Sequence, residues 1–471
     1  MPEICYSDTV NIQNRVGVVY QPPHYDESLA RASVRQAVES IGVTWDALVQ
    51  PGEQVVLKPN FIRESHTNRP GEWEQIITHG TIIAAVALEV AAAMQGRGTI
   101  TIADAPQTDS DFDKICERGQ IPQLRERLRR TFPGLSFDVI DLRREVWRTI
   151  NGVIVERHKL PEDPRGYTLV NLGQHSCFHG KSGRFYGADY DTAFTAVHHS
   201  NGTHEYLISR SVMDADVFIN LPKLKTHKKV GVTLSLKNLV GINADKNWLP
   251  HHTDGDPAQG GDEHPMPGPK HRLERRLVKL SHRAIVAFPG AGSYLLRKAR
   301  KPGLRVFGDS ENVVRCGNWY GNDTVWRMCL DLNKLLAYGN PDGTLREGVA
   351  QNRKRHYVLV DGIVAGEGRG PIDPDPVPAG LLAFGTHAPS VDAACAYLMG
   401  FDPARIPIIA NAFGCKRYPL APGGLCEFEI RSNRPEWNGR ICDLSDVETL
   451  HFKPHFGWTN QIERTARHVL R

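Results

Sequence analysis

Apolar residues along the chain alternate between stretches with helical spacing and short continuous runs. Leu29–Ile41 and the alanine-rich Thr81–Met94 have the spacing of amphipathic or buried helices. Gln54–Leu57 and Thr99–Ala103 are short apolar runs that follow glycine- or proline-containing turns, and they predict two strands. Helices that alternate with short apolar strands are typical of a parallel sheet. We therefore predict an α/β fold with a largely parallel sheet flanked by helices.

The same pattern returns in the second half of the chain. Asp216–Leu221, Tyr357–Val360 and Leu381–Phe384 are predicted strands, and Val391–Met399 is a predicted helix. The chain has 471 residues, more than the roughly 250–300 that one hydrophobic core usually supports. Several packed parts are therefore expected.

Three stretches depart from the alternating pattern. Residues 142–211 have mixed polarity and short β-like runs, which predicts a strand-rich insertion. Residues 247–269 have little apolar periodicity and many glycines and prolines, and such a long loop is usually functional or disordered. Residues 271–300 are basic and helical in pattern. The predicted organisation is an N-terminal core part (1–141), the insertion (142–211), a lysine-rich motif and long loop (212–270), a basic helical segment (271–355) and a C-terminal core part (356–471).

Five predicted strands end in polar or turn-forming residues. In open α/β sheets, ligands bind beyond the carboxyl ends of the strands. If the five strands are parallel members of one sheet, their polar ends converge on one rim and form a binding site. The alternative is that each is an ordinary turn. The five ends are Lys58-Pro59-Asn60, Asp104, Asn220 with Lys223, Asp361, and Thr386-His387.

The segment from Asn220 to Asn247 has the highest density of lysines. Clustered ammonium groups repel one another unless anions offset them, so this cluster favours a phosphate or carboxylate ligand. Lys237 lies among apolar residues, where a lysine needs a partner or has a lowered pKa. The alternative is a solvated basic face, which accounts well for Lys228 and Lys229. The cluster comprises Lys223, Lys225, His227, Lys228, Lys229 and Lys237, with Asn238 beside them.

Carboxylates and histidines supply candidates for metal or proton chemistry. Residues 361–371 form a glycine-rich segment in which Glu367 is a candidate for either role, although an ordinary tight turn explains the glycines equally well. Asp104 and Asp361 follow predicted strands and suit magnesium, which prefers oxygen ligands. The grouped histidines have no diagnostic metal-binding spacing, so an ordinary hydrogen-bonded loop is the alternative for each group. They are His198, His199 and His204 in the insertion, and His251, His252 and His264 in the long loop.

Several ordered motifs resemble the bacterial family known as domain of unknown function 362. The run INLPKLKTH, followed by GVTLSLKNLVGI, resembles the family signature. VVLKPNF, IADAP, VDGIVAGEGRGP and SVDAACAYLMGFDP match in order, so the resemblance covers about residues 55–414. It implies an α/β fold with these motifs around one cleft, and it implies no particular reaction. Many relatives carry a ferredoxin-like insert with four cysteines; its absence here puts an electron-transfer role in doubt, and no iron–sulfur cluster is expected.

Composition narrows the class of protein. A net charge of +4 is small for this length, which argues against a nucleic-acid binder. The nine cysteines are scattered without a CxxC pair, and no secretory leader opens the chain. We therefore expect reduced thiols in a cytoplasmic protein. The longest apolar stretch is too short to cross a bilayer.

Together these observations predict an enzyme that acts on an anionic small molecule in a lysine-rich cleft, assisted by a divalent metal for which magnesium is favoured. Two alternatives stay open: a non-catalytic module that binds a polyanion or an anionic membrane through residues 272–300, and a metal-dependent redox enzyme. The predicted catalytic residues are His227, Lys237 and Glu367; the predicted substrate-binding residues are Lys58, Asn60, Lys223, Lys225 and Asn238; the predicted metal ligands are Asp104 and Asp361.

Overall fold

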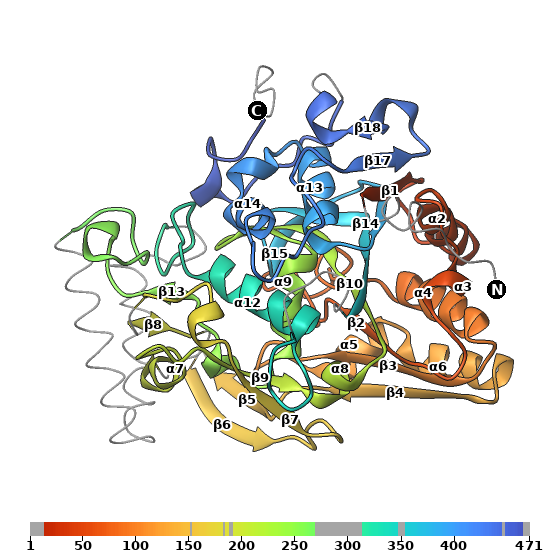
Figure 1. Ribbon diagram of the computed structural model, residues 1–471, viewed down its shortest axis with the longest axis horizontal. Helices are drawn as coiled ribbons and strands as arrows, with labels where there is room; N and C mark the ends of the chain where they lie inside the picture. Colours follow the sequence, from red (N-terminus) through yellow and green to blue (C-terminus); the bar gives the residue numbers. More distant parts are fainter. Residues whose placement is uncertain are drawn as a thin grey trace.

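The predicted strands join one large sheet in the computed structural model, which describes residues 14–150, 153–181, 184–187, 192–268, 313–346, 354–444 and 448–464. The described residues form a sheet of 12 strands, nine of them in the order β18-β17-β1-β16-β14-β10-β2-β3-β4 (Figure 1). β11, β12 and β15 extend it beside β14. The strands are β1 (Arg15–Tyr20), β2 (Gln54–Pro59), β3 (Gly98–Asp104), β4 (Leu135–Asp141), β10 (Val217–Leu221), β11 (Lys223–His227), β12 (Gly231–Thr233), β14 (Arg355–Arg369), β15 (Asp373–Val377), β16 (Leu381–Gly385), β17 (Glu429–Ser432) and β18 (Gly439–Arg440).

The sheet is parallel in one half and mixed in the other. Strands β14, β10, β2, β3 and β4 are mutually parallel neighbours. β16 pairs antiparallel with both β14 and β1. The α/β fold with helices around a large sheet is thus confirmed, and the parallel arrangement holds for the half that contains β2, β3 and β10. Because β16 runs the other way, Thr386 and His387 lie at the opposite edge, and their predicted place on the common rim is wrong.

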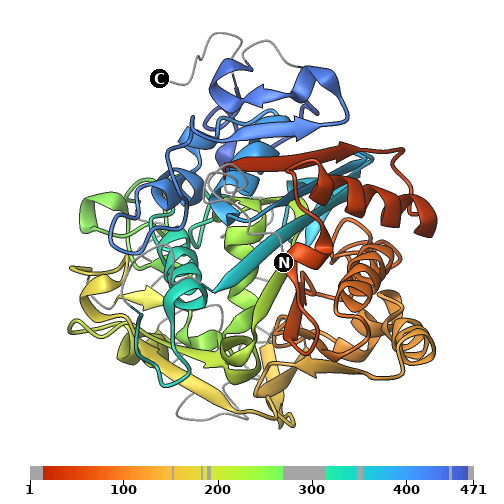
Figure 2. The same cartoon turned by 45° about the vertical axis from the view of Figure 1, so that its right-hand side comes forward.

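Helices cover both faces of the sheet because successive side chains of its buried strands point to opposite faces and both faces are apolar. In β2, Val55 and Leu57 pack into one hydrophobic cluster and Val56 into the other. The first cluster is covered by α2, α3, α4, α5 and α6, which lie together on one side in Figure 2. The second includes α12, α13 and α14. These helices are α2 (Glu27–Glu39), α3 (Trp45–Leu48), α4 (Gly80–Ala93), α5 (Phe112–Arg118), α6 (Ile121–Thr131), α12 (Val325–Tyr338), α13 (Ala388–Leu398) and α14 (Pro407–Phe413).

Residues 142–211 contain short strands that stay outside the large sheet. Among the described residues they contribute to three two-stranded sheets: β5-β6 and β7-β9, which lie toward the lower side of Figure 1, and β8-β13, which lies at its left. The elements of this region are β5 (Glu145–Ile150), β6 (Val153–Lys159), β7 (Tyr167–Asn171), η1 (Gly173–His175), β8 (Phe185–Tyr186), α7 (Thr192–His198), β9 (Glu205–Ser209) and α8 (Arg210–Asp214), with β13 (His252–Thr253) supplied by the long loop.

The long loop packs against the rest of the chain. Residues 247–268 contain β13 and the short helix η4 (Pro257–Gln259). Asp262 holds the loop in place because one carboxylate oxygen accepts from the Thr253 N–H at 2.6 Å and the other from the Thr324 hydroxyl at 2.7 Å. The basic segment 272–300 lies outside the described residues.

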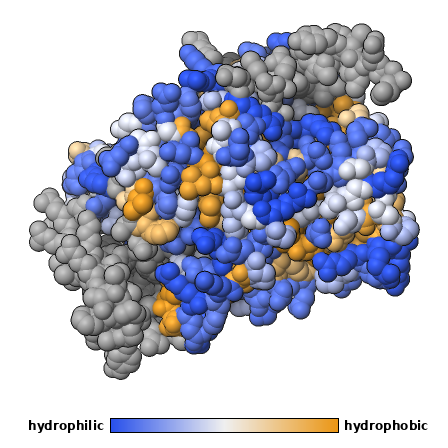
Figure 3. All heavy atoms as spheres, turned by 60° about the horizontal axis from the view of Figure 1, so that its bottom comes forward, coloured by the Kyte–Doolittle hydropathy of each residue, from blue (hydrophilic) through white to orange (hydrophobic). Residues whose placement is uncertain are grey.

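Two further features concern the surface and the cysteines. Among the described residues, no helix is long and apolar enough to cross a membrane. The face in Figure 3 is largely hydrophilic, and its apolar residues form separate strips. Cys426 and Cys442 form a disulfide, so the expectation that the thiols are all reduced is wrong for this pair.

Candidate functional site

A cavity of about 630 Å³ opens beyond the carboxyl ends of β2 and β3. Lys58 and Asn60 come from β2 and the residues after it, and Asp104 ends β3. The lysine-rich motif, the long loop and the insertion form the other walls. They contribute, among others, His227, Lys228, Lys229, Thr233, Lys237, Asn238, Lys246, His251, His252, Trp147, Thr149 and Tyr186.

The structure divides the predicted site residues into two groups. Those that line the cavity are Lys58, Asn60, Asp104, His227, Lys237 and Asn238. The others lie elsewhere: Lys223, Lys225, Asp361 and Glu367 are not part of its wall.

A buried ion pair forms the floor where β2 and β3 end. The Lys58 ammonium lies 2.7 Å from the Asp104 carboxylate, and both side chains are almost fully buried. Asp104 also accepts hydrogen bonds from the Phe61 N–H at 2.7 Å and the Ala105 N–H at 2.9 Å. Burial lowers the pKa of Lys58, and the neighbouring carboxylate opposes this shift. The two parallel strands therefore bring opposite charges together, as their neighbouring positions in the sheet require.

Gly241 packs directly against this ion pair. A Cβ atom at this position would lie 1.7 Å from Asp104 Oδ1 and 2.7 Å from Lys58 Nζ. The Gly241 carbonyl also accepts from the Ala105 N–H at 2.8 Å. Only glycine leaves room for the pair, which explains the glycine in the NLVGI motif.

The short helix α9 (Ser235–Asn238) carries two residues of the cavity wall. Asp392 of α13 caps it, because its carboxylate accepts from the Ser235 N–H and the Leu236 N–H, each at 2.9 Å. Burial raises the pKa of Asp392 to about 7, although these hydrogen bonds act to lower it. Asp392 therefore positions Lys237 and Asn238 without reaching the cavity.

Asn238 orients Lys58. Its side-chain oxygen accepts from Lys58 Nζ at 3.2 Å, and its amide nitrogen donates to the side chain of Asn220 at 2.7 Å. Asn60, from the opposite wall, accepts from the Ile62 N–H at 3.4 Å through its Oδ1 atom. Among the described residues the Asn60 amide nitrogen donates no hydrogen bond, and the residue lines the cavity.

Lys237 is a buried lysine for which the described residues supply no counter-ion. Its exposed fraction is 9%, and within the described part of the chain its ammonium makes no hydrogen bond or ion pair. Burial lowers its pKa, with partial compensation from Cys329 and Asp104 at longer range. A buried ammonium without a partner is unfavourable. Its position on the cavity wall therefore favours an anionic ligand.

His227 offers a hydrogen-bond donor, and His251 offers an acceptor. The Lys229 N–H donates to His227 Nδ1 at 3.0 Å, so neutral His227 carries its proton on Nε2. His251 Nδ1 lies 2.8 Å from the Leu249 carbonyl oxygen and is protonated, which leaves its Nε2 atom as an acceptor. Burial lowers the pKa of both imidazoles well below the usual 6.5, and nearby lysines add to this shift. Both are therefore neutral near pH 7.

Lys246 is a functional candidate that the sequence did not identify, and Lys229 is a member of the predicted cluster that was not among the predicted site residues. Burial lowers the pKa of Lys229 to about 8 and that of Lys246 to about 7. Lys246 Nζ donates to the Val240 carbonyl at 3.0 Å, and Lys229 lies near His251 and His252. In the sequence a solvated face accounts well for Lys229 as an alternative, because the loop and insertion that enclose it are distant in the chain.

Lys223 and Asp361 form a second buried ion pair, away from the cavity. Lys223 Nζ lies 2.8 Å from Asp361 Oδ2, and neither side chain is exposed. The same carboxylate accepts from the Tyr25 hydroxyl at 2.9 Å and from the His79 N–H at 2.8 Å. Lys225 is also buried and donates to the Ile76 carbonyl and, at 3.5 Å, to Asn60 Oδ1. These lysines stabilise the joint between β11, β14 and the N-terminal part.

The glycine-rich segment 361–371 is mostly strand rather than a turn. β14 continues to Arg369, and β11 lies beside it. Cβ atoms at Gly362, Gly366 and Gly370 would lie within about 2–3 Å of Leu224, Lys225 or Thr226, so glycine allows the close approach of β11. Glu367 accepts from the Lys453 N–H at 2.8 Å. The glycines therefore serve strand packing, not a phosphate-binding turn.

The carboxylates predicted to bind a metal are occupied by protein donors. Both oxygens of Asp104 and both oxygens of Asp361 accept the hydrogen bonds and ion pairs described above. Among the described residues, no group of three or more histidine, cysteine or acidic side chains is arranged to hold a metal ion. In this geometry the two aspartates act as counter-ions to lysines.

The histidines of the insertion have structural contacts. His198 stacks on Trp248 with ring centroids 3.5 Å apart and lies 2.8 Å from Glu205. His199 Nε2 lies 2.7 Å from the Trp248 carbonyl oxygen, and burial lowers its pKa to about 3. These side chains connect the insertion to the long loop.

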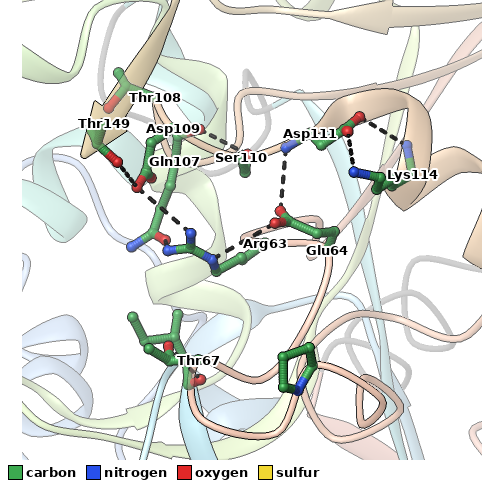
Figure 4. A network of polar contacts seen from close by, with 12 residues as sticks. Arg63, Glu64, Thr67, Gln107, Thr108, Asp109, Ser110, Asp111, Lys114 and Thr149 are labelled. Atoms are coloured by element: carbon green, nitrogen blue, oxygen red, sulfur yellow. Dashed lines mark hydrogen bonds and ion pairs between the residues drawn. The ribbon is translucent and has the colours of Figure 1, made fainter. Parts of the chain in front are cut away.

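One rim of the cavity is a polar network on the loop after β3 (Figure 4). Thr149 of β5 donates to Asp109 at 3.4 Å, which joins the insertion to this loop. Arg63 lies between Gln107 at 3.3 Å and Asp109 at 3.6 Å. The rim therefore offers both hydrogen-bond donors and acceptors to a ligand.

Comparison with solved structures gives partial overlaps. The lactate racemase apoprotein of Thermoanaerobacterium thermosaccharolyticum is 10% identical, with a TM-score of 0.34; the match covers 83% of this chain and 58% of that one. A protein from Thermotoga maritima is 14% identical, with a TM-score of 0.23, over 48% of this chain and 40% of that one. The chain spans less than two thirds of either structure.

Comparison with sequences gives a clearer result. A thylakoid-associated protein of Synechocystis sp. is 24% identical over 386 residues, which are 82% of this chain and 75% of that protein. The family model described as domain of unknown function (DUF362) matches residues 153–397, more than half of the chain. That range contains the lysine-rich motif, α9 and the Asp392 cap, and it confirms the resemblance seen in the sequence motifs. The chain belongs to the DUF362 family.

Proposed function

We propose that this protein is an enzyme that acts on a small molecule bearing a phosphate or carboxylate group, bound in the lysine-lined cavity. The observation that carries the proposal is Lys237, a buried ammonium on the cavity wall without an ion-pair partner among the described residues. An anion bound there would supply the missing counter-charge. The resulting charge-assisted hydrogen bond is stronger than a neutral one.

The charge of the whole wall supports the same ligand class. The described residues that line the cavity include six lysines and arginines but only three acidic residues. One of the three, Asp104, is already paired with Lys58. A concave site with an excess of positive charge attracts anions and concentrates them.

Proton transfer is the chemistry that these side chains support. Lysines with pKa values of about 7 and 8 are partly neutral near physiological pH, so Lys246 and Lys229 are candidate proton acceptors. His227 presents an N–H group and could stabilise charge that develops on an oxygen. In this proposal Lys237 neutralises the substrate and Asn60 orients it, while Lys58 stays paired with Asp104.

Magnesium is a separate part of the hypothesis. Because the oxygens of Asp104 are already occupied, a divalent ion would enter bound to a phosphorylated substrate, with Asp109 and Glu263 as nearby carboxylates on the wall. Phosphate titrations with and without magnesium test this form of the proposal. A cytoplasmic location stays a prediction.

The test is the substitution Lys237→Met, which removes the charge and keeps an apolar stem. Binding of inorganic phosphate and pyrophosphate, measured by calorimetry, is expected to weaken at least about tenfold, the effect of losing one charge-assisted hydrogen bond. Turnover of a panel of phosphate esters and carboxylates should fall with it. Lys453→Met is the matched control, because Lys453 is 82% exposed and lies outside the cavity.

Other outcomes would overturn the proposal. Equal binding by the wild type and Lys237→Met would remove its basis. Loss of binding only when Arg275, Arg276 and Lys279 are neutralised would favour the module that binds a polyanion or an anionic membrane. A stoichiometric transition metal in the purified protein would favour the redox alternative.

A further inference from the structure

One part of the cavity wall carries two stacked rings. Tyr186 of β8 and His252 of β13 both line the cavity, and their rings lie nearly parallel, at an angle of 11° with centroids 4.7 Å apart. The two residues are direct partners in the antiparallel pairing of β8 with β13. Cross-strand partners of this kind hold their side chains in contact. The insertion and the long loop therefore build one aromatic surface, the ring pair, between them.

Packing around the ring pair fixes its position. A Cβ atom at Gly317 would lie 2.9 Å from the Cβ atom of His252, so the backbone there packs directly against the histidine. The His251 N–H donates to the Tyr186 carbonyl at 2.7 Å, and Asn322 donates to the His251 carbonyl at 3.1 Å. His252 is 7% exposed, whereas Tyr186 is half-buried. Because His252 covers one face of the Tyr186 ring, the accessible part of that ring is its other face and its edge.

The ring pair adjoins the lysines of the cavity. Lys229 Nζ lies 3.5 Å from His252 Nδ1 and 3.4 Å from the His251 carbonyl oxygen. Burial lowers the pKa of His252 well below 6.5, and the charge of Lys229 adds to this shift. The His252 imidazole is therefore neutral near pH 7 and contributes a ring rather than a second cation. An aromatic surface and a cationic one lie side by side on the wall.

The remaining wall and the volume of the cavity suit a ligand larger than a bare anion. Apolar side chains from the loop after β2, from the insertion and from the motif also line it, namely Ile62, Trp147, Ile154 and Val240. A volume of about 630 Å³ lies within the range of roughly 300–1,000 Å³ that is typical of sites for organic molecules with an apolar body and a few polar groups. An inorganic phosphate would leave most of this wall uncovered.

We propose that the anionic molecule bound in this cavity also carries a planar unsaturated ring, which packs on Tyr186 while the phosphate or carboxylate lies at the lysines. This inference rests on the proposed function, because one cavity holds both parts of the ligand. Aromatic rings attract each other in offset or edge-to-face contacts, in addition to burying apolar area. A saturated ring of similar size gains from burial alone. Tyr186 is then the residue that determines specificity, and Lys237 the one that binds the anion.

The test compares three phosphate monoesters by calorimetry on the full chain at pH 7.5, above their second pKa of about 6. Methyl phosphate reports the anion alone, cyclohexyl phosphate adds a saturated ring, and phenyl phosphate adds a planar one. Phenyl phosphate is expected to bind about tenfold more tightly than methyl phosphate and about threefold more tightly than cyclohexyl phosphate.

The other outcomes separate this inference from the proposed function. Equal affinity for phenyl and methyl phosphate would overturn the ring and leave the anion site intact. Cyclohexyl phosphate bound as tightly as phenyl phosphate would overturn the aromatic contact, because an apolar surface alone does not favour the planar ring. Absence of binding by all three esters would overturn the proposed function, and this inference with it.

Substitutions assign the ring contact to Tyr186. Tyr186→Leu should lose the preference for phenyl over methyl phosphate and bind methyl phosphate as the wild type does, whereas Tyr186→Phe should keep the preference because it keeps the ring. Lys237→Met should weaken both esters alike, because they share the phosphate. Tyr20→Leu is the matched control, since Tyr20 is 37% exposed and lies outside the cavity. A preference that survives in Tyr186→Leu, or an equal loss of methyl phosphate in that variant, would show that Tyr186 does not hold the ring.

Discussion

Lys223 and Lys237 belong to the same lysine-rich motif and are both buried, yet their surroundings differ. Lys223 lies 2.8 Å from Asp361 in a fully enclosed network with Tyr25 and His79. Lys237 faces the cavity, where the described residues offer it no counter-ion. A buried charge with a partner holds structure together, whereas one without a partner is a place for a ligand. The same residue type thus serves two purposes within one motif.

The largest expected effect is on the paired lysine. Lys223→Met should lower the free energy of unfolding by about 3–5 kcal/mol, because it leaves Asp361 buried without a counter-charge. Lys237→Met should leave the free energy of unfolding unchanged or raise it, because it removes a buried charge that the described residues leave unpaired. Urea denaturation of both variants gives the comparison.

The double variant Lys223→Met with Asp361→Asn is the control for this experiment. It removes both charges and should recover much of the lost stability. Equal destabilisation by Lys223→Met and Lys237→Met would mean that both lysines are structural, and the distinction between them would fail.

The sequence predicted the elements better than their directions. Gln54–Leu57 and Thr99–Ala103 are apolar runs preceded by turns, and both are strands of the sheet. The direction of β16 depends on its connection to β14 through β15, which residue patterns do not reveal. The glycines of β14 were visible, but only the packing of β11 shows that they serve close contact between strands.

The sequence predicted the part of the site that is formed by residues at the ends of strands. Lys58, Asn60 and Asp104 converge because β2 and β3 are parallel neighbours. Lys229 and Lys246 depend on how the long loop and the insertion fold over the motif, and local pattern carries no such information. Asp392 did leave a signal, since an aspartate in an otherwise apolar helix needs a partner.

The second prediction concerns the ion pair between Lys58 and Asp104 on the cavity floor. This pair holds β2 and β3 together and also lines the cavity. Gly241→Ala places a Cβ atom 1.7 Å from Asp104 Oδ1. The clash should destabilise the chain by about 1–3 kcal/mol, the usual range for overpacking. It should also weaken phosphate binding, because Lys58 must move with Asp104. Gly71→Ala is the matched control, since a Cβ atom there meets nothing within 4 Å. Equal stability of the two variants would show that Lys58 and Asp104 do not need their close pairing.

The smallest expected effect is the change of sulfate affinity with pH. It distinguishes the cavity lysines from Lys223, which does not line the cavity. Sulfate is a suitable probe because its charge does not change between pH 6.5 and 9. Its affinity should fall about tenfold across this range, as Lys246 and Lys229, with pKa values of about 7 and 8, lose their protons.

The free energy of unfolding should move in the opposite direction. A lysine whose pKa is lowered by folding binds its proton less tightly in the folded chain, so stability rises as pH climbs from that value toward the ordinary 10.5. Lys246→Met should remove the part of both trends that begins near pH 7. If sulfate affinity is instead constant across this range, Lys246 and Lys229 do not hold the anion, and the cavity is not the anion site that we propose.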